Sequence, residues 1–380
     1  MKIKIAFYIE SMVVGGAERV LIDTVNNMNP EKYDITVIAI FKNSVYGKYN
    51  LKFKDLFHSN VHFRYLIDNS KSWKYTLFNY SFAHFNKARV YSKYIKEQFD
   101  IEVSCYEGLP TEFLAYSTNK HSKKVAWLQT DNARIYKNCT EAEIKAINEM
   151  YKRFDCVVGS SSRVVESFLE LFSGVPTKMV HNVFQSDQIV EKSFQPCELP
   201  IVEIPTFVAV GRLTPVKGYD RLINAAAALH REKFQFRLIM LGEGELREIF
   251  QTMISENELE NTVFLLGNQD NPYSYMRNGS YFVCSSVAEG FSTVVVEAIL
   301  CDLPVLTTNV SGMKDIFGDC ECGQICENSE EGIYKMLKNQ LQHPELREKY
   351  VSECKKRKEF FSIEKRMRDI EALYDEVLNE

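Results

Sequence analysis

The residues best suited to chemistry lie in one loop of the second half of the chain, residues 211–218. The loop follows an apolar run, and it holds Arg212 and Lys217 between Gly211 and Gly218. A diphosphate needs such a set: a forked donor, a compact cation, and backbone without obstructing side chains. The loop lacks the Gly-Lys-Ser/Thr ending of a P-loop, so no Walker site is predicted. The alternative is that both cations are simply solvated at the surface.

A second loop carries two carboxylates. Glu289 follows the apolar run 281–284, and Glu297 lies eight residues later in the predicted helix 294–298. Each carboxylate can accept two hydrogen bonds from hydroxyl groups, so the pair suits a polyhydroxylated ligand. Residues 290–293 would present free backbone N–H groups at the start of the helix. The alternative is that Glu289 is a turn residue and that Glu297 is solvated.

Paired glycines mark two more strand ends. Gly15 and Gly16 follow the first apolar run and open a helix, which would let the backbone approach a ligand. A tight strand-to-helix turn would explain them equally well. Gly242 and Gly244 follow a later apolar run and hint at a dinucleotide fingerprint. Because Arg247 stands where that fingerprint needs its third glycine, a simple turn is the better interpretation.

Short apolar runs alternate with longer amphipathic segments along the chain. This alternation is typical of parallel sheets covered by helices. The predicted strands are 3–9, 34–41, 61–67, 101–106, 124–128, 155–160, 177–181, 206–211, 235–241, 262–267, 281–285 and 304–308. Sites in open parallel sheets lie at the carboxyl ends of the strands. The sequence therefore predicts an α/β protein with two Rossmann-like β/α/β domains facing each other across a cleft that holds the site.

The length of 380 residues suits two domains. We expect an N-terminal domain at 1–185 and a C-terminal domain at 206–361. Residues 186–205 show no periodicity and carry three prolines, which indicates a linker. The last segment, 362–380, has an apolar stripe at helical spacing, and we expect it to pack back on the N-terminal domain.

The composition excludes several classes of protein. With 45% hydrophobic and 26% charged residues, the chain is neither disordered nor fibrous. A net charge of -5 gives no sign of a nucleic-acid partner. No apolar run resembles a signal peptide or a membrane span. We expect a cytoplasmic protein that could also lie peripherally on the inner face of the cell membrane.

Cysteine usage favours free thiols. Several of the ten cysteines lie in apolar runs, as buried thiols of a reducing compartment do. The only cluster is Cys320, Cys322 and Cys326, and a zinc site would need a Cys-x2-Cys pair with a fourth ligand. We therefore expect no metal.

The motifs occur in a particular order: Gly15-Gly16, the 211–218 loop, Gly242-Glu243-Gly244, Leu266-Gly267 and the block 289–298. Each alone is weak, but the ordered set resembles the large family-4 group of retaining glycosyltransferases with the GT-B fold. The resemblance covers most of the chain and is specific over residues 206–310.

The resemblance implies a role for each motif. Arg212 and Lys217 would hold the donor diphosphate and stabilise the charge that builds on it. Glu289, with the backbone amides after it, would hold the donor sugar, and Glu297 would hold the ribose. The nucleobase would lie near Gly267. The implied catalytic residues are Glu289, Arg212 and Lys217; the implied donor-binding residues are Gly15, Gly16, Gly211, Gly242, Gly267, Asn268, Gln269, Gly290, Phe291, Ser292, Thr293 and Glu297.

The resemblance also implies the type of chemistry. Members of the family retain anomeric configuration and need no divalent metal, and this chain has no Asp-x-Asp motif. The donor would be a nucleotide sugar, with UDP the expected nucleotide by family frequency. No cofactor is expected.

One position departs from the family pattern. In many relatives a histidine occupies a position like Gln129, near the transferring sugar. A glutamine can orient a hydroxyl but cannot titrate, so it cannot be a general base. The leaving phosphate can accept the acceptor's proton instead in a front-face retaining mechanism. We expect Gln129 and Asp131 on the acceptor side; the alternative is that Trp127 is a core aromatic and Asp131 a helix cap.

The acceptor side is expected in the N-terminal half. Residues 61–100 hold seven basic residues against three acidic ones, and they are rich in aromatics. The apolar residues at helical spacing, expected in the core, are Phe78, Phe82, Phe85, Ala88, Tyr91, Ile95 and Phe99. Arg89, Lys93 and Lys96 lie on another face. That face could contact anionic lipid headgroups beside a lipid-linked acceptor, or it could simply be solvated.

The resemblance therefore implies an enzyme. It would move a hexose or N-acetylhexosamine from a nucleotide sugar to a glycan or polyprenyl-diphosphate-linked acceptor, in the synthesis of a surface polysaccharide or glycoconjugate. A first alternative is a catalytically silent partner of another glycosyltransferase, but the four charged residues that such a partner would lose are present. A sugar-nucleotide epimerase or a phosphorylase would share the architecture.

Overall fold

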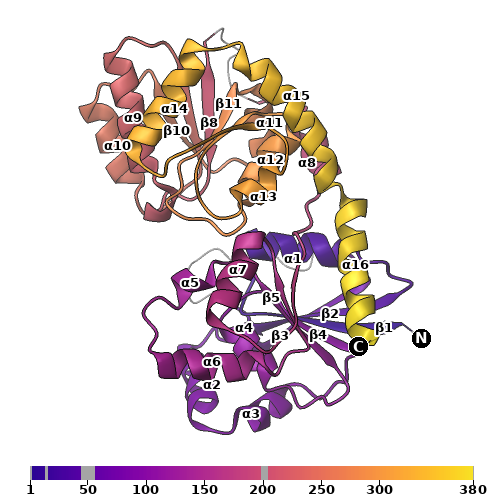
Figure 1. Ribbon diagram of the computed structural model, residues 1–380. Coiled ribbons are helices and arrows are strands. Elements are labelled where there is room, and N and C mark those ends of the chain that lie inside the picture. Colours follow the sequence, from indigo (N-terminus) through magenta and orange to yellow (C-terminus); the bar gives the residue numbers. More distant parts are fainter. Residues whose placement is uncertain (1, 13–15, 44–55, 198–203, 380) are drawn as a thin grey trace. The chain divides into compact units, whose positions relative to one another are not determined.

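The computed structural model describes residues 2–12, 16–43, 56–197 and 204–379. The chain divides into two compact units (Figure 1). The N-terminal unit comprises Met1–Phe184 and Ile363–Glu380, and the C-terminal unit comprises Gln185–Ser362. Each unit is built on one parallel sheet with helices on both faces, so both Rossmann-like domains are confirmed.

The sheet of the N-terminal unit has the strand order β3-β2-β1-β4-β5-β6-β7. Its strands are β1 (Ile3–Ile9), β2 (Tyr33–Phe41), β3 (Val61–Ile67), β4 (Ile101–Ser104), β5 (Lys123–Leu128), β6 (Cys156–Gly159) and β7 (Thr177–Met179). Its helices are α1 (Gly16–Asn27), α2 (Ser72–His84), α3 (Lys87–Tyr94), α4 (Leu109–Ala115), α5 (Asn132–Ile135), α6 (Glu141–Tyr151), α7 (Ser162–Leu171) and α16 (Ile363–Asn379). Every strand predicted in this half is present.

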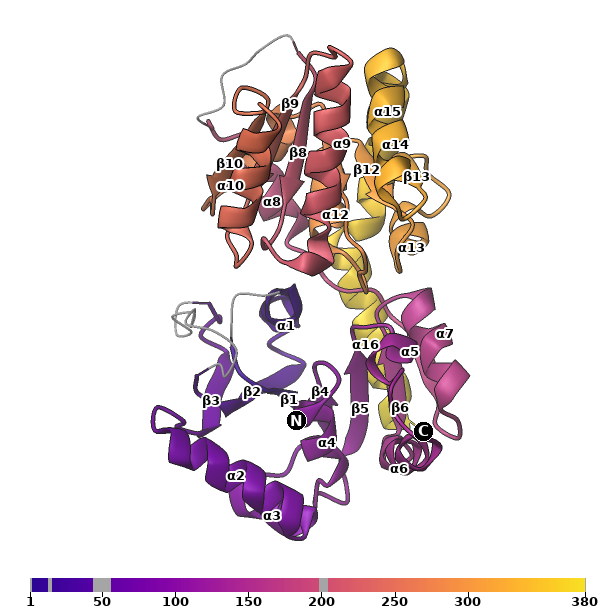
Figure 2. The same ribbon diagram turned by 90° about the vertical axis from the view of Figure 1, so that its left-hand side faces the viewer.

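The sheet of the C-terminal unit has the order β10-β9-β8-β11-β12-β13. Its strands are β8 (Thr206–Val210), β9 (Arg237–Leu241), β10 (Val263–Gly267), β11 (Tyr281–Cys284), β12 (Val305–Thr308) and β13 (Gly323–Cys326). Its α-helices are α8 (Ser186–Ser193), α9 (Tyr219–Arg231), α10 (Arg247–Glu256), α11 (Pro272–Asn278), α12 (Thr293–Leu300), α13 (Met313–Phe317), α14 (Glu330–Gln342) and α15 (Leu346–Lys358), with 3-10 turns at Pro215–Lys217 and Glu359–Phe361. Figure 2 shows α9 and α10 together on one face of this sheet.

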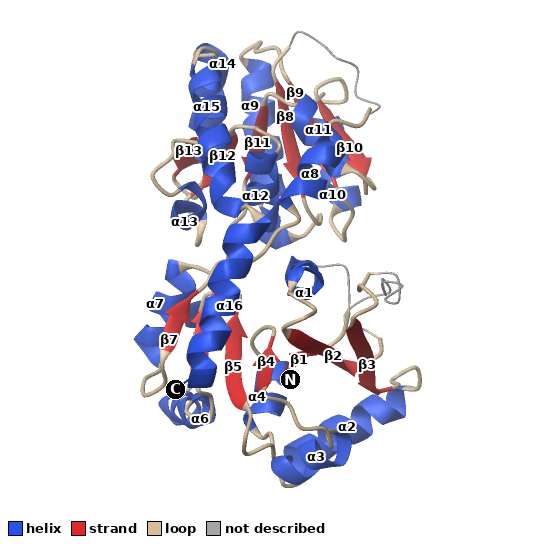
Figure 3. Cartoon of the chain, turned by 90° about the vertical axis from the view of Figure 1, so that its right-hand side faces the viewer, coloured by secondary structure: helices blue, strands red, loops and turns tan. Residues whose placement is uncertain are grey.

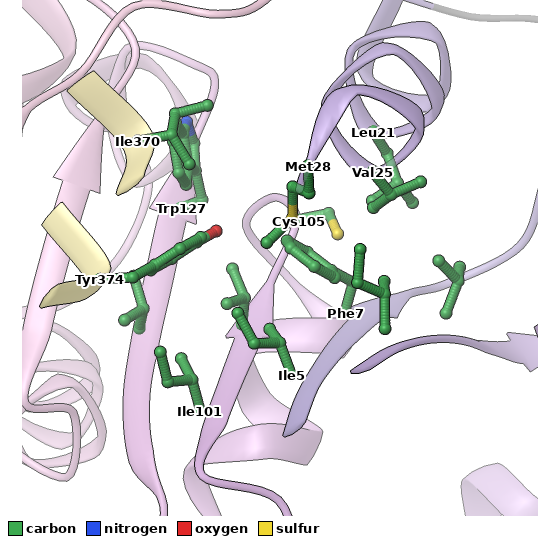
Figure 4. Packing of buried hydrophobic residues seen from close by; sticks show 14 of the residues in the cluster. Ile5, Phe7, Leu21, Val25, Met28, Ile101, Cys105, Trp127, Ile370 and Tyr374 are labelled. Carbon is green, nitrogen blue, oxygen red and sulfur yellow. The ribbon is translucent and has the colours of Figure 1, made fainter. Parts of the chain in front are cut away.

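The end of the chain completes the core of the N-terminal unit. Helix α16 contributes Met367, Ile370, Leu373, Tyr374 and Val377, which are all buried in the cluster that α1 shares with one face of the sheet. Tyr374 meets Phe7 of β1 edge to face, with ring centroids 6.5 Å apart. Figure 4 shows Ile370 and Tyr374 directed from α16 toward the side chains of the strands. The apolar stripe of this segment therefore has a partner.

The prediction of an irregular linker is wrong for its first part. Residues Ser186–Ser193 form helix α8, in which Ile189 is buried. The side-chain amide of Asn271, just before α11, donates to the Lys192 carbonyl over 2.8 Å. This short helix belongs to the C-terminal unit because it packs against α11 and α12 of that unit. Eight residues are too few for the apolar periodicity to stand out.

The predicted core stripe of residues 78–99 also needs one correction. Phe85 is 62% exposed, whereas Phe78 and Phe82 are buried. The chain leaves the helix at Phe85, and the side chain of Asn86 accepts from the Arg89 N–H to begin α3. An N-cap asparagine therefore breaks the predicted continuous spacing into two helices.

Candidate active site

The strand order of the C-terminal unit reverses direction between β8 and β11. Ligands of open parallel sheets bind outside the carboxyl ends of the strands at such a switch point. The loop after β8 carries Arg212 and Lys217, and the loop after β11 carries Glu289. The two charged loops found in the sequence are therefore neighbours at the point where the topology favours a site.

Lys217 and Glu289 form an ion pair. The Nζ atom of Lys217 lies 2.8 Å from Oε1 of Glu289, although the residues are 72 positions apart. The hydroxyl of Ser286 donates to the same oxygen over 2.5 Å. The two side chains are 20% and 14% exposed, so both still reach the surface. A cation and a carboxylate held side by side can bind a phosphate oxygen and a sugar hydroxyl at once.

The backbone fixes these two loops against each other. The Val287 N–H donates to the Val216 carbonyl over 2.8 Å, and the Ser285 hydroxyl donates to the Lys217 carbonyl over 2.9 Å. Gly218 has φ +59°, and a Cβ at this position would lie 2.4 Å from the Ser285 carbonyl oxygen. Only glycine fits there. This contact explains the glycine that closes the 211–218 loop.

Arg212 differs from Lys217. It is exposed, and it makes no ion pair with any residue that the structure describes. An exposed guanidinium at the end of β8 is available for a phosphate from solution.

Three glycines bring the strand ends of β8, β9 and β10 together. The Gly211 N–H donates to the Leu241 carbonyl, and the Gly242 N–H donates to the Gly267 carbonyl. A Cβ on Gly242, which has φ +137°, would lie 2.1 Å from the Gly211 carbonyl oxygen. At these glycines the strand ends expose backbone atoms that no side chain covers. Beyond them, Asn268 is exposed, and Gln269 accepts from the Tyr275 hydroxyl over 3.1 Å.

The segment Gly290–Thr293 leads into helix α12. Phe291 and Ser292 are buried, and Ser292 is the N-cap without a side-chain capping bond. Its hydroxyl has no hydrogen-bonding partner among the described residues. The first N–H groups of the helix remain as donors at this end. Glu297, one turn along, is partly buried and accepts from the Tyr273 hydroxyl over 3.4 Å.

The N-terminal unit places the predicted acceptor-side residues at the carboxyl edge of its own sheet. The side-chain amides of Gln129 and Asn182 pair with each other at 2.9 and 3.4 Å. Asp131 is the N-cap of α5, accepting from the Ala133 N–H, and it pairs with Arg163 at 3.0 Å. Asp131 is therefore a helix cap, the alternative considered for it.

The remaining predictions in this unit concern Trp127 and the glycine pair. Trp127 is 6% exposed and belongs to the core, again the alternative given for it. Gly16 is the exposed first residue of α1, and Gly15 lies outside the described residues.

Sequence reasoning missed Glu107, in the loop after β4. Its Oε1 accepts from the backbone N–H groups of Gln129 and Thr130, over 2.8 and 2.7 Å. Burial raises the pKa of this carboxyl from 4.5 to about 7, and the hydrogen bonds that it accepts offset part of that rise. Glu107 directly follows the predicted strand 101–106, and a carboxylate at that place was the available signal.

The described residues form neither a cluster of metal-binding side chains nor a membrane-spanning helix. No group of three or more His, Cys, Asp or Glu side chains in these ranges is placed to hold a metal ion. The ten cysteines are free thiols. Among the same residues, no helix is both long and apolar enough to cross a membrane.

Comparison with known proteins identifies the family. Residues 196–357 match the family model of glycosyl transferases group 1. The chain is similar to the N-acetylgalactosamine-N,N'-diacetylbacillosaminyl-diphospho-undecaprenol 4-alpha-N-acetylgalactosaminyltransferase of Campylobacter jejuni. The two are 31% identical over 280 residues, which are 69% of this chain and 75% of that protein.

Two solved structures share the fold. A glycosyltransferase from Rickettsia africae has a TM-score of 0.78 at 18% identity, covering 99% of each chain. Anabaena HepE in complex with UDP and glucose has a TM-score of 0.72 at 17% identity, covering 98% of this chain and all of that one. The chain thus belongs to the group 1 glycosyl transferases, and it is a glycosyltransferase with the GT-B fold.

Proposed function

We propose that this enzyme transfers a hexose or N-acetylhexosamine from a UDP-sugar to a lipid-linked glycan acceptor, with retention of anomeric configuration. The observation that carries the donor part is the Lys217–Glu289 pair at the switch point, with the unpaired Arg212 beside it in the same loop. This set offers two cations to a diphosphate and a carboxylate to a sugar.

The proposed chemistry follows from these charges. As the bond between the anomeric carbon and the diphosphate breaks, negative charge grows on the leaving group. Lys217 and Arg212 stabilise that charge, and the N–H groups at the start of α12 add donors. Glu289 gives up part of its contact with Lys217 and accepts hydrogen bonds from sugar hydroxyls. Glu297 accepts from the ribose, and the segment from Gly267 to Gln269 receives the base.

The nucleotide and the acceptor are proposed from relatives. HepE was solved with UDP and glucose, which supports a UDP-sugar. The Campylobacter relative acts on a diphospho-undecaprenol-linked sugar, which supports a lipid-linked acceptor. Because Lys217 and Arg212 can supply the positive charge that a divalent ion would otherwise provide, we propose that transfer needs no metal.

A lipid-linked acceptor requires access to a membrane surface, and helix α2 of the N-terminal unit suits that role. Trp73, Leu77 and Tyr80 are each more than half exposed, as is Phe85 at its end. Exposed Lys71 precedes the helix, and Arg89 and Lys93 follow on α3. Aromatic and aliphatic side chains flanked by cations favour anionic lipid headgroups. We propose that this surface holds the enzyme peripherally on the inner face of the membrane.

A transfer assay tests the proposal. The purified full chain is incubated with each of four UDP-sugars (Glc, Gal, GlcNAc, GalNAc) and a synthetic undecaprenyl-diphosphate N-acetylhexosamine. Mass spectrometry should find one added sugar, NMR should find the donor's anomeric configuration in the product, and EDTA should leave the rate unchanged. Glu289→Gln should abolish transfer, whereas Lys335→Ala, at an exposed ion pair on α14, should not. UDP release without modification of the acceptor would favour the epimerase alternative. UDP binding without any turnover would favour the silent-partner alternative.

A further inference from the structure

Helix α11 lies beside the residues to which we assign the nucleoside of the donor, although no motif of the sequence marked it. The helix begins at Pro272, and proline is favoured at the first position of a helix. It carries two buried tyrosines, Tyr273 and Tyr275. The helix and its neighbours in the site all belong to the C-terminal unit.

The two tyrosines leave the helix in opposite directions. Residues two positions apart in a helix point about 200° apart around its axis. The ring of Tyr275 packs with Ile239 and Leu241 of β9. The hydroxyl of Tyr273 instead reaches Glu297 on α12. One helix therefore contacts two separate parts of the donor site.

Tyr273 contacts the carboxylate that would hold the ribose. Its hydroxyl donates to Oε1 of Glu297 over 3.4 Å, although the two residues are 24 positions apart. A hydrogen bond from a buried phenol restricts the orientations that a partly exposed carboxylate can adopt. The ribose would therefore meet a carboxylate that is already oriented.

Tyr275 fixes the end of the segment that would receive the base. Its hydroxyl donates to Oε1 of Gln269 over 3.1 Å, and Nε2 of Gln269 donates to the Leu266 carbonyl over 2.9 Å. Both ends of the amide are engaged, so its orientation is determined. Gly267 and Asn268 lie between these two anchor points. Because uracil and cytosine differ in the donors and acceptors of one edge, a loop held in one conformation can distinguish them.

The helix itself is held firmly at its start. The side-chain amide of Asn271 donates to the Lys192 carbonyl over 2.8 Å and to Oε1 of Gln195 over 3.1 Å. The Ser274 hydroxyl donates to the Asn271 carbonyl over 3.1 Å, and Met276 is fully buried. The two phenols therefore extend from a fixed element, as precise positioning of a ligand requires.

We propose that Tyr273 and Tyr275 are positioning residues for the nucleoside of the donor, an inference that rests on the proposed function of this site. Tyr273 orients Glu297 for the ribose hydroxyls. Tyr275 orients Gln269 and the loop before it for the base. Neither tyrosine touches the reacting atoms. Selection of the ribose and selection of the base are then two separable properties of one helix.

The competing explanation is that both hydroxyls serve only the packing of core tyrosines. Tyr273→Phe and Tyr275→Phe each remove one hydroxyl and keep the ring, so the packing is retained. Tyr334→Phe is the matched control, because that hydroxyl also donates to a carboxylate, Glu232, but at the exposed surface of α14. A packing role alone predicts a loss of stability, or equal weakening for every nucleotide.

The test measures the binding of three nucleotides to the full chain by isothermal titration calorimetry: UDP, CDP, and dideoxy-UDP, which lacks both ribose hydroxyls. The wild type and Tyr334→Phe should bind UDP at least about 10-fold more tightly than either analogue. Tyr273→Phe should lower the preference for UDP over dideoxy-UDP at least about threefold and leave the preference over CDP unchanged. Tyr275→Phe should do the reverse. The melting temperature of each variant is measured alongside.

The inference would be overturned if the wild type showed neither preference, or if both preferences kept their wild-type values in both variants. It would also be overturned if both preferences fell together in each variant, because that result indicates a general loosening of the site. A wild type that binds none of the three nucleotides is a different result, and it would contradict the proposed function itself.

Discussion

Lys217 and Glu289 meet at 2.8 Å because two loops 72 residues apart leave adjacent strands at the same edge of the sheet. The sequence predicted a binding role for each residue, because its type and its place after an apolar run indicate phosphate or sugar binding. The contact itself, and the role of Ser286 in holding Glu289, depend on the strand order. Glu107 was missed because no spacing connects it to Gln129; only the adjacency of β4 and β5 brings them together.

At the scale of a residue, the protonation of Glu107 should make the stability of the protein depend on pH. Its pKa is about 7 in the folded chain and near 4.5 when exposed. Between these values the unfolded chain gives up the proton first, so the free energy of unfolding should fall as pH rises from about 4.5 to 7. A shift of this size corresponds to at most about 3 kcal/mol.

Glu107→Gln removes this titration. Its stability relative to the wild type should increase from pH 4.5 to 7 and then remain constant, as measured by urea unfolding across that range. A stability difference that does not change with pH would contradict the burial of an ionisable group at this position.

At the scale of elements, strands were predicted where an apolar run marked them. The missed strand β13 lies at the edge of its sheet and is partly exposed along its whole length. It therefore shows neither alternation nor a continuous apolar run. Helix α8 was missed for a similar reason, and the break between α2 and α3 depended on one capping asparagine. Where a single contact sets the end of a helix, the apolar periodicity of the sequence does not show that end.

The carboxyl ends of β8 and β9 approach each other closely, and this contact predicts the effect of a substitution at Gly242. Gly242→Ala would place a Cβ 2.1 Å from the Gly211 carbonyl oxygen at φ +137°. Backbone strain and overlap together should destabilise the C-terminal unit by about 3 kcal/mol or more. Gly108→Ala is the control, because its φ is +89° but no atom lies within 4 Å of the added Cβ. It should cost only about 1 to 2 kcal/mol. Equal losses in thermal unfolding would argue against the packed junction.

At the scale of the molecule, the chain forms two units, and its last helix returns to the first of them. We expected the apolar stripe of residues 362–380 to pack on the N-terminal domain, and it does so, against α1 and the sheet of that unit. The stripe alone could not identify which surface of the domain it covers, because an apolar face packs against any complementary surface. The stability of the N-terminal unit therefore depends on the end of the chain.

Tyr374 tests this dependence. It is fully buried, and Tyr374→Ala should destabilise the N-terminal unit by about 3 to 5 kcal/mol. Its hydroxyl has no hydrogen-bonding partner among the described residues, so Tyr374→Phe should be close to neutral. In calorimetry, the alanine variant should lower the transition of the N-terminal unit only, and Gly242→Ala that of the C-terminal unit only. A single transition moved equally by both would show that the units unfold together.

The most direct test is to measure the binding of UDP by isothermal titration calorimetry. We expect the wild type to bind UDP. Arg212→Ala and Lys217→Ala should each weaken binding about 10- to 100-fold, because each removes a charged hydrogen bond to the diphosphate. Lys335→Ala, which changes the net charge equally on α14, should bind as the wild type does. Wild-type affinity in both site variants, or no binding of UDP to the wild type, would contradict the assignment of the donor site.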